Sequence, residues 1–182
     1  MDFINILTIT ISLLALLVTY AVFKSNQQPR IIVFATPHYG KETFIQLHIK
    51  NIGNSIAENV EIKADRKIPR QAFGISNLNG NKQFFDNGIF NYGIKNFIPN
   101  QSYIYDWGQF GGLKETLNNQ PITFYVTYEY KHPLNLWKSK IQDTSIINIQ
   151  ELEALPSSTG NSTEQLRKIG NELAKLTNKI SK

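Results

Sequence analysis

Three histidines are the side chains of this 182-residue chain best suited to metal binding or proton transfer: His38, His48 and His132. They are well separated in sequence, and each falls in a predicted turn or on the polar face of a predicted strand. None forms an i, i+2 or i, i+4 pair with another histidine or an acid on a matched face, so the spacing of a metal site is missing. We therefore expect no bound metal.

Motifs for nucleophilic catalysis and phosphate binding are also missing from the sequence. It contains no nucleophile elbow, no P-loop and no glycine-rich turn that opens a helix. Asp65 and Asp106 have no sequence partner that would make either of them part of an acid–base pair. The stretch Gly108–Gly112 is more typical of a bent strand end than of a ligand-binding loop. We expect no enzymatic activity and no cofactor.

Composition narrows the classes of partner. The chain has 19 Lys and Arg against 14 Asp and Glu, for a net charge of +5, but 15 of the cations are Lys and only 4 are Arg. Nucleic-acid interfaces favour clustered Arg, and this chain is instead rich in Asn and Ile. With no cysteine, disulfides and thiolate metal sites are impossible. We expect no nucleic-acid partner.

An apolar segment at the N-terminus predicts a transmembrane helix. Phe3–Phe23 contains no charged residue, and a helix of this length spans about 31 Å, close to the thickness of the hydrocarbon core. A cleavable signal peptide would need a basic start and a shorter apolar core, and neither is present. Lys24, Arg30 and Lys41 follow the segment and no Lys or Arg precedes it, so we expect residues 24–182 to lie in the cytoplasm.

The chain after this helix predicts an antiparallel β-sandwich of about seven strands over residues 30–150, joined to the helix by a tether over 24–29. Ile45, Leu47 and Ile49 alternate with polar residues, as in a strand with one buried face. Short turns separate the apolar runs, and no helical period intervenes. The expected strands cover residues 30–35, 43–50, 60–64, 84–92, 103–107, 122–130 and 137–149.

A second helix is predicted at the C-terminus, after a flexible linker over residues 151–163. The helix covers 164–181, and its apolar residues follow the 3, 4, 3, 4 spacing of a coiled coil: Leu166, Ile169, Leu173, Leu176 and Ile180. A helix of this length is marginal alone, so its apolar seam must pair with another copy, with a helix of a partner or with the sandwich. The sequence leaves these three alternatives open.

The segment Lys50–Val60 resembles a recurring motif of bacterial CARDB-like modules, which are immunoglobulin-like β-sandwiches. The matching residues are Asn51, Gly53, Ala57 and Val60, and the later turn Phe97–Ser102 is similar to a second turn of those modules, with Asn100 where glycine is usual. The resemblance implies a fold in which the motif is a structural turn between the second and third strands. It also implies a bacterial single-pass membrane protein, hence an inner or plasma membrane. It carries over no functional residue.

The transmembrane segment carries a second possible seam for self-association. Asn5, Thr8, Ser12, Ala15 and Thr19 repeat at 3, 4, 3, 4 spacing, which places small and polar residues on one helix face. Small residues let membrane helices approach closely, and hydroxyl and amide groups can hydrogen-bond across the contact. Alternatively, the hydroxyls bond only the backbone of their own helix.

Two functions of different class remain compatible with these features. In the first, the chain is a membrane-anchored interaction or scaffold protein with a cytoplasmic sandwich that binds a protein partner or another copy of itself. In the second, the topology is reversed and the sandwich is an extracytoplasmic adhesion or ligand-binding module for glycans or peptides. In both, the lipid bilayer is a partner through Phe3–Phe23.

The C-terminal seam gives the first testable prediction. Replacing Leu173 and Leu176 by Asp puts two charges into the apolar seam, so we expect self-association or partner capture to be lost. Chemical crosslinking of the detergent-solubilised chain measures this. The control, Asn171→Asp with Asn178→Asp, adds the same charges off the seam and should leave crosslinking intact. Crosslinking that survives in the Leu variant would contradict a role for the seam.

Overall fold

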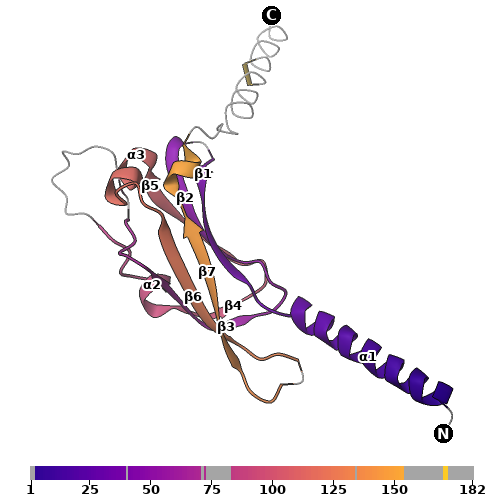
Figure 1. Cartoon of the computed structure of the whole chain (residues 1–182). Coiled ribbons are helices and arrows are strands. Elements are labelled where there is room, and N and C mark those ends of the chain that lie inside the picture. Colours follow the sequence, from indigo (N-terminus) through magenta and orange to yellow (C-terminus); the bar gives the residue numbers. More distant parts are fainter. Residues whose placement is uncertain are drawn as a thin grey trace, which may run out of the picture.

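An apolar helix projects from one end of a β-domain in the computed structural model (Figure 1). The structure describes residues 3–39, 41–70, 72, 83–133, 135–153 and 170–171. Helix α1 (Phe3–Asn26) is the one described helix long and apolar enough to cross a membrane. It is longer than the expected span 3–23 and ends three residues before Pro29, which lacks the amide that a helix interior needs.

The described part of the β-domain contains seven antiparallel strands in two sheets. The first sheet has the order β1-β2-β5 and the second has the order β4-β3-β6-β7. The mainly β fold expected from the sequence is therefore confirmed. The strand bounds are β1 (Ile31–His38), β2 (Lys41–Asn51), β3 (Ala57–Ala64), β4 (Ile94–Phe97), β5 (Ser102–Gln109), β6 (Ile122–Tyr130) and β7 (Ser139–Ile147).

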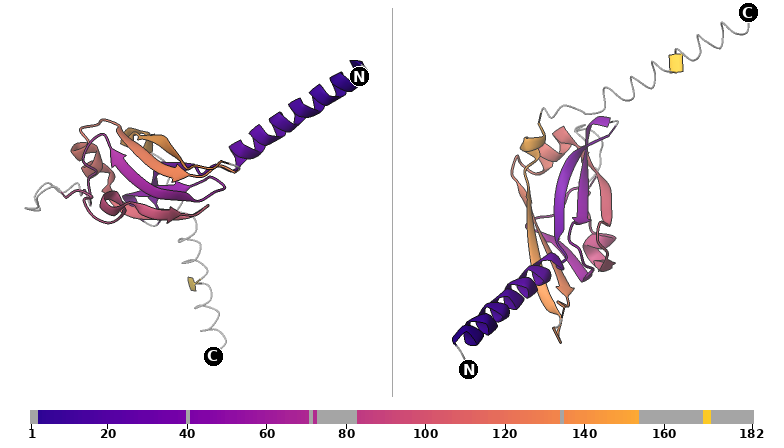
Figure 2. Two further views of the ribbon diagram at one scale, coloured as in Figure 1. Left: turned by 90° about the horizontal axis from the view of Figure 1, so that it is seen from below. Right: turned by 90° about the vertical axis from the view of Figure 1, so that its right-hand side faces the viewer.

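The two sheets face each other across one hydrophobic core (Figure 2). Alternation along β2 and β6 explains the arrangement, because every second residue of each strand points inward. Leu47 and Ile49 of β2 and Phe124 and Val126 of β6 belong to this one core, and all four side chains are buried. Trp107 of β5 is also buried and donates from Nε1 to the carbonyl oxygen of Pro69 at 2.9 Å.

Several elements differ from the sequence-based expectations. Residues 84–92, expected as a strand, contain the short helix α2 (Ile89–Tyr92), and the fourth strand is β4 instead. Strand β5 ends at Gln109 with an irregular register beside Gly108, but the rest of the stretch Gly108–Gly112 begins an unexpected helix, α3 (Phe110–Thr116), from which Leu113 packs into the core. Trp137, expected in the last strand, precedes β7 in the hairpin loop. A 3-10 helix, η1 (Ile149–Leu152), follows β7.

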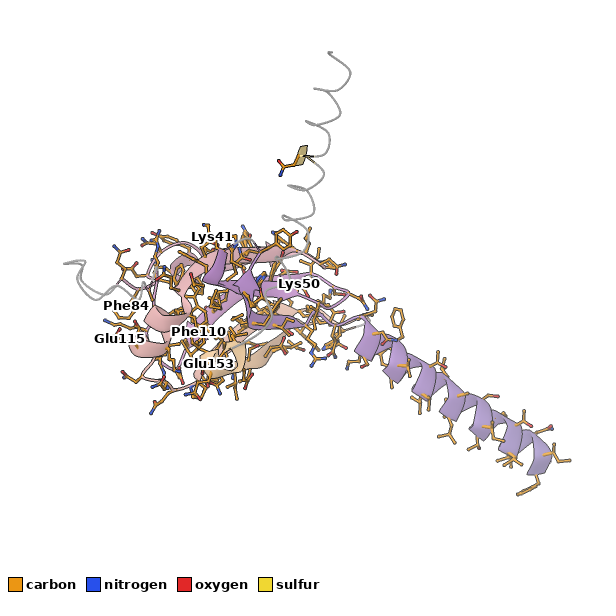
Figure 3. All side chains as sticks on the ribbon, turned by 90° about the horizontal axis from the view of Figure 1, so that it is seen from above. Lys41, Lys50, Phe84, Phe110, Glu115 and Glu153 are labelled. Atoms are coloured by element: carbon orange, nitrogen blue, oxygen red, sulfur yellow. The ribbon has the colours of Figure 1, made fainter. Side chains whose placement is uncertain are left out.

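The β-domain has two distinct ends. The end that contacts α1, which we call the proximal end, is built from the turn 51–56, the turn 98–101 and the β6–β7 hairpin loop, described at residues 131–133 and 135–138. Strand β6 runs from the other, distal end towards it, so Ile122 is distal and Tyr130 is proximal. The contact between Lys114 of α3 and Glu153 places α3 and η1 together at the distal end (Figures 1 and 3).

The expected C-terminal helix lies outside the described residues, apart from positions 170–171. Its seam residues Leu166, Ile169, Leu173, Leu176 and Ile180 are all outside the described part of the chain. The linker expected over 151–163 is described only to residue 153, where η1 has ended.

Candidate functional site

The connection between α1 and the β-domain, residues 26–31, is hydrogen-bonded along its length, and we call it the junction. Its carbonyl oxygens from Asn26 to Arg30 face donors at the proximal end. Asn54 donates twice: its Nδ2 bonds Asn26 O at 2.9 Å, and its backbone amide bonds Gln28 O at 3.2 Å. Gln27 O accepts from Ser55 Oγ at 2.6 Å and from the Tyr130 hydroxyl. Arg30 O accepts from the backbone amide of Ile52 at 2.8 Å. The segment expected as a tether over 24–29 is thus partly helix and otherwise bound to the β-domain.

The side chain of Asn51 ties the junction to two turns. Its Oδ1 accepts from the amides of Arg30, at 3.3 Å, and Gly53, at 3.0 Å. Its Nδ2 donates to the carbonyl oxygens of Ser55 and Phe97, both at 2.9 Å. Asn51 is 0% exposed, and these four bonds use the full capacity of its amide. Any residue without both a donor and an acceptor here would leave buried backbone groups unpaired.

Gly53 is required by close packing of backbone against backbone. Glycine is often needed in a turn for a positive φ, but the described residues with positive φ do not include Gly53. Instead, a Cβ at this position would lie 2.3 Å from the amide nitrogen of Arg30 and 2.4 Å from the carbonyl oxygen of Gln28. The glycine therefore lets the junction lie directly on the turn 51–56. Asn100 of the second turn does have positive φ, at 63°, which explains why glycine is usual there.

Tyr128 and Asp143 hold the end of the junction from inside the β-domain. The Tyr128 hydroxyl lies 2.9 Å from both Pro29 O and Asp143 Oδ2, and Asp143 Oδ2 accepts the amide of Ile31 at 2.7 Å. Burial, and after it the Asp143 carboxylate, raise the pKa of the Tyr128 phenol well above its ordinary value of 10.0. The phenol consequently remains a hydrogen-bond donor throughout the physiological range.

The three histidines lie apart from one another in the structure. His38 Nε2 is 3.8 Å from Asp106 Oδ1 near the surface, whereas the ring of His48 stacks on Phe34. His132 is buried in the hairpin loop against Tyr130, and burial together with Lys24 lowers the pKa of its imidazole. Among the described residues, no three His, Asp or Glu side chains gather as metal ligands would.

The residues proposed for self-association through α1 lie on an open helix surface. In this single chain the hydroxyls of Thr8, Ser12 and Thr19 donate to the carbonyl oxygens four residues earlier, at 2.8–2.9 Å. Asn5 and Ala15 share that exposed face. The hydroxyl oxygens keep free lone pairs, so they can still accept a bond from a neighbouring helix. Figure 3 shows the side chains of α1 clear of the β-domain along most of its length.

The remaining motif residues and the aromatic strand faces are mainly buried. Ala57 and Val60 of β3 lie in the core, and Ala57 pairs with Phe97 of β4. Two aromatic residues of β5 and β6, Trp107 and Tyr128, also face the core. The large exposed aromatic side chain at the proximal end is Trp137. Sequence reasoning missed it, because a Trp beside a β pattern is more often part of the strand.

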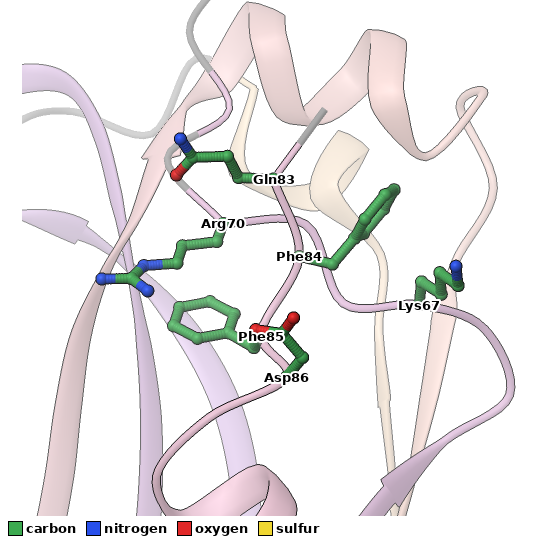
Figure 4. Close-up of a pocket in the computed structure, with 6 residues that line it drawn as sticks. All are labelled: Lys67, Arg70, Gln83, Phe84, Phe85 and Asp86. Atoms are coloured by element: carbon green, nitrogen blue, oxygen red, sulfur yellow. The ribbon is translucent and has the colours of Figure 1, made fainter. Parts of the chain in front are cut away.

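An open cleft of about 460 Å³ lies away from α1, between the chain that follows β3 and the chain that precedes α2 (Figure 4). It is lined by Lys67, Arg70, Gln83, Phe84, Phe85 and Asp86. Both cations lie over its aromatic rings: Lys67 Nζ is 5.5 Å from the Phe84 ring centre, and the Arg70 guanidinium carbon is 5.9 Å from that of Phe85. The cleft therefore offers rings and a net positive charge together.

A family match covers the helix and the β-domain together. Residues 3–153 match the model of a family described as Domain of unknown function (DUF8453). The chain belongs to the DUF8453 family. The family model thus includes α1, the junction and both sheets of the chain as one unit. Neither the comparison with curated proteins nor that with solved structures gave a match.

The close packing at Gly53 gives a prediction for this DUF8453 chain. Gly53→Ala must push the junction off the turn 51–56, so we expect it to lower the free energy of unfolding by about 2 kcal/mol or more. Thermal unfolding of the detergent-solubilised full chain measures the change. Gly111→Ala is the control, because its Cβ meets nothing within 4 Å and alanine favours the helix α3. Equal losses in the two variants would refute the close-packing argument.

The raised pKa of Tyr128 predicts sensitivity of this DUF8453 chain to alkali. The unfolded phenol ionises near pH 10 while the folded one keeps its proton, so stability should fall above that pH by up to about 1.4 kcal/mol per pH unit. Below pH 10 the contribution is fully present. Tyr128→Phe should make the alkaline decline shallower in urea unfolding followed by fluorescence. Tyr125→Phe, on the outer face of β6, should behave as the natural chain; identical slopes in all three would contradict the assignment.

Proposed function

We propose that this protein is a single-pass, membrane-anchored interaction module whose β-domain lies in the cytoplasm. Helix α1 is apolar and its side chains are open along the span, which supports a lipid environment. Lys24 and Arg30 follow the span directly and favour the cytoplasmic side for the β-domain.

The junction is the observation that carries the proposal. A flexible tether would let a domain sample all orientations, as a recruitment arm does. Here five consecutive carbonyl groups face donors of the β-domain, so α1 and the β-domain hold one relative pose. Such a connection keeps the distal end, with α3 and η1, at a set distance from the bilayer. Presenting a surface at a set height is what a scaffold requires.

The immunoglobulin-like, CARDB-like relationship is part of this proposal. Sheets of three and four antiparallel strands are the layout of seven-strand immunoglobulin-like domains, and such domains serve widely as binding scaffolds. Self-association through the α1 face at Thr8, Ser12 and Thr19, or through the C-terminal seam, would place several β-domains side by side on the membrane.

The cleft between Lys67 and Phe85 is the contact surface that we propose for a protein partner. Arginine and aromatic residues are enriched at protein interfaces, and the cleft combines Arg70 and Lys67 with the partly buried rings of Phe84 and Phe85. Its two cations outnumber its one acid, Asp86, so a segment carrying carboxylates fits its charge.

Crosslinking in native membranes tests the proposed interaction. The variant Lys67→Glu with Arg70→Glu reverses the charge of the cleft, and we expect it to lose crosslinked partners several-fold, as identified by mass spectrometry. The control, Lys63→Glu with Lys95→Glu, makes the same charge change at exposed positions on β3 and β4. Loss in both or neither would reject the cleft as the contact.

The anchoring and the topology are tested on the same cells. Carbonate washing should leave the full chain in the membrane pellet, and release into the wash would overturn the anchor. Protease added to intact cells should leave residues 24–182 uncut. Digestion there would replace the cytoplasmic proposal by the extracytoplasmic adhesion or ligand-binding alternative.

A further inference from the structure

We propose that the β6–β7 hairpin loop, through its described residues 131–133 and 135–138, is a second membrane contact that inserts Leu136 and Trp137 into the lipid interface. This inference rests on the proposed anchoring by α1 and goes beyond it, because it makes the β-domain itself bind lipid. The carrying observation is the contact between Tyr20 of α1 and Pro133 of the loop, where the Tyr20 hydroxyl donates to the Pro133 carbonyl oxygen at 3.2 Å.

The position of Tyr20 sets the depth of the loop. Every residue of the span Phe3–Phe23, all of it described, is exposed except Tyr20, which is half-buried where the loop contacts it. Tyr20 lies four residues before Lys24, a rise of about 6 Å along the helix. The headgroup layer on each side of a bilayer is about 5–8 Å thick. With α1 spanning the bilayer, Pro133 therefore lies at the boundary between headgroups and acyl chains.

The loop carries the side chains that such a boundary favours. Leu136 and Trp137 are 77% and 78% exposed, which among the described apolar side chains of the β-domain only Tyr92 exceeds. Tryptophan is enriched at membrane interfaces because its ring is apolar and its indole N–H can bond headgroups. In water these two neighbours would form an exposed apolar patch at the tip of a hairpin. Insertion into lipid removes this patch from water without a change in the fold of the β-domain.

The charges around the loop are compatible with this depth. Lys131 and Lys138 flank the apolar tip, and Lys138 forms an ion pair with Glu58. Lysine side chains beside an apolar anchor reach headgroup phosphates while their stems lie on acyl chains. His132, the other titratable group in the loop, is buried against Tyr130 and faces Lys24, so its ring stays neutral and adds no charge at the boundary.

A two-point attachment defines the pose of the whole β-domain. One point is the span of α1, and the other is the hairpin loop beside it at the proximal end (Figures 1 and 2). Anchoring by α1 alone would leave the tilt of α1 in the bilayer free, and with it the tilt of the β-domain that is joined to it. With the loop held in the interface, the hairpin side of the domain is fixed toward the bilayer.

The chain supplies its own probe for this contact. It has two tryptophans, and Trp107 is 0% exposed in the core, whereas Trp137 is in the loop. Asp106, the residue before Trp107, pairs with Gln46 of β2, which is five positions from the proximal end of β2, a separation of about 17 Å along the strand. Fluorescence that is lost in Trp137→Phe therefore reports the loop.

The experiment uses the full chain in phosphatidylcholine vesicles whose acyl chains carry bromine close to their carbonyl ends. We expect the Trp137 fluorescence to fall by roughly half relative to unbrominated vesicles, and acrylamide added to the water to quench it weakly. Trp137→Phe should abolish the bromine effect. Leu136→Asp keeps the reporter but disfavours insertion, so it should reduce bromine quenching and increase acrylamide quenching. Ile104→Asp, on the exposed face of β5, is the control and should change neither.

Co-flotation separates the two proposals. A chain that floats with the vesicles without bromine quenching of Trp137 would overturn the loop contact and leave the anchor standing. A chain that does not float would overturn the anchor itself, and the loop contact with it. Trp137 could also be protected from acrylamide only at a high ratio of protein to lipid. Loss of this protection on dilution in lipid would show that a second copy covers the loop, and it would also overturn the lipid contact.

Discussion

Main-chain carbonyl groups at and beyond the end of a helix need new hydrogen-bond donors. The donors that the β-domain supplies between Asn26 and Arg30 determine how this molecule is arranged. The helical hydrogen-bond ladder ends with α1, so each following carbonyl requires another partner. Water would supply it in a flexible linker. Here the donors are Asn54, Ser55, Ile52, Tyr128 and Tyr130. They come from a turn in one part of the sequence and from β6 much later, so the complete junction needs both of these elements in place.

Asn51 shows how one side chain can join segments that are distant in sequence. Its carbonyl oxygen serves the junction and its own turn, and its amide group serves that turn and the start of the turn after β4. Because the group is buried, each bond replaces one that water cannot make, and loss of any partner would cost more than an exposed bond. Gly53 completes this arrangement by leaving room for the backbone of Arg30.

The sequence predicted the elements that follow a simple period and missed those that depend on tertiary contacts. Alternation located β2 and β6 because half of each strand is buried. It missed α3, whose Gly111 and Gly112 disfavour a helix until Leu113 packs into the core. The turn at Asn51 was found, but its bonds to Arg30 and Phe97 were not, since no local pattern records a partner 46 residues away. Trp137 was placed in a strand because its exposure is a property of the folded hairpin.

The opposite placement of α1 and η1 has a mechanical consequence. A force between the membrane and a partner held by the C-terminal segment would enter at Ile31, at the proximal start of β1, and leave at Ile147, at the distal end of β7. Such a pull runs parallel to the strands, so the interstrand hydrogen bonds are strained together rather than one after another. The backbone amides of Ile31 and Val33 donate hydrogen bonds to the side chains of Asp143 and Ser145 of β7, so the two loaded strands are bonded directly to each other. The fold is therefore arranged to resist tension along the axis on which a membrane-bound scaffold would be pulled.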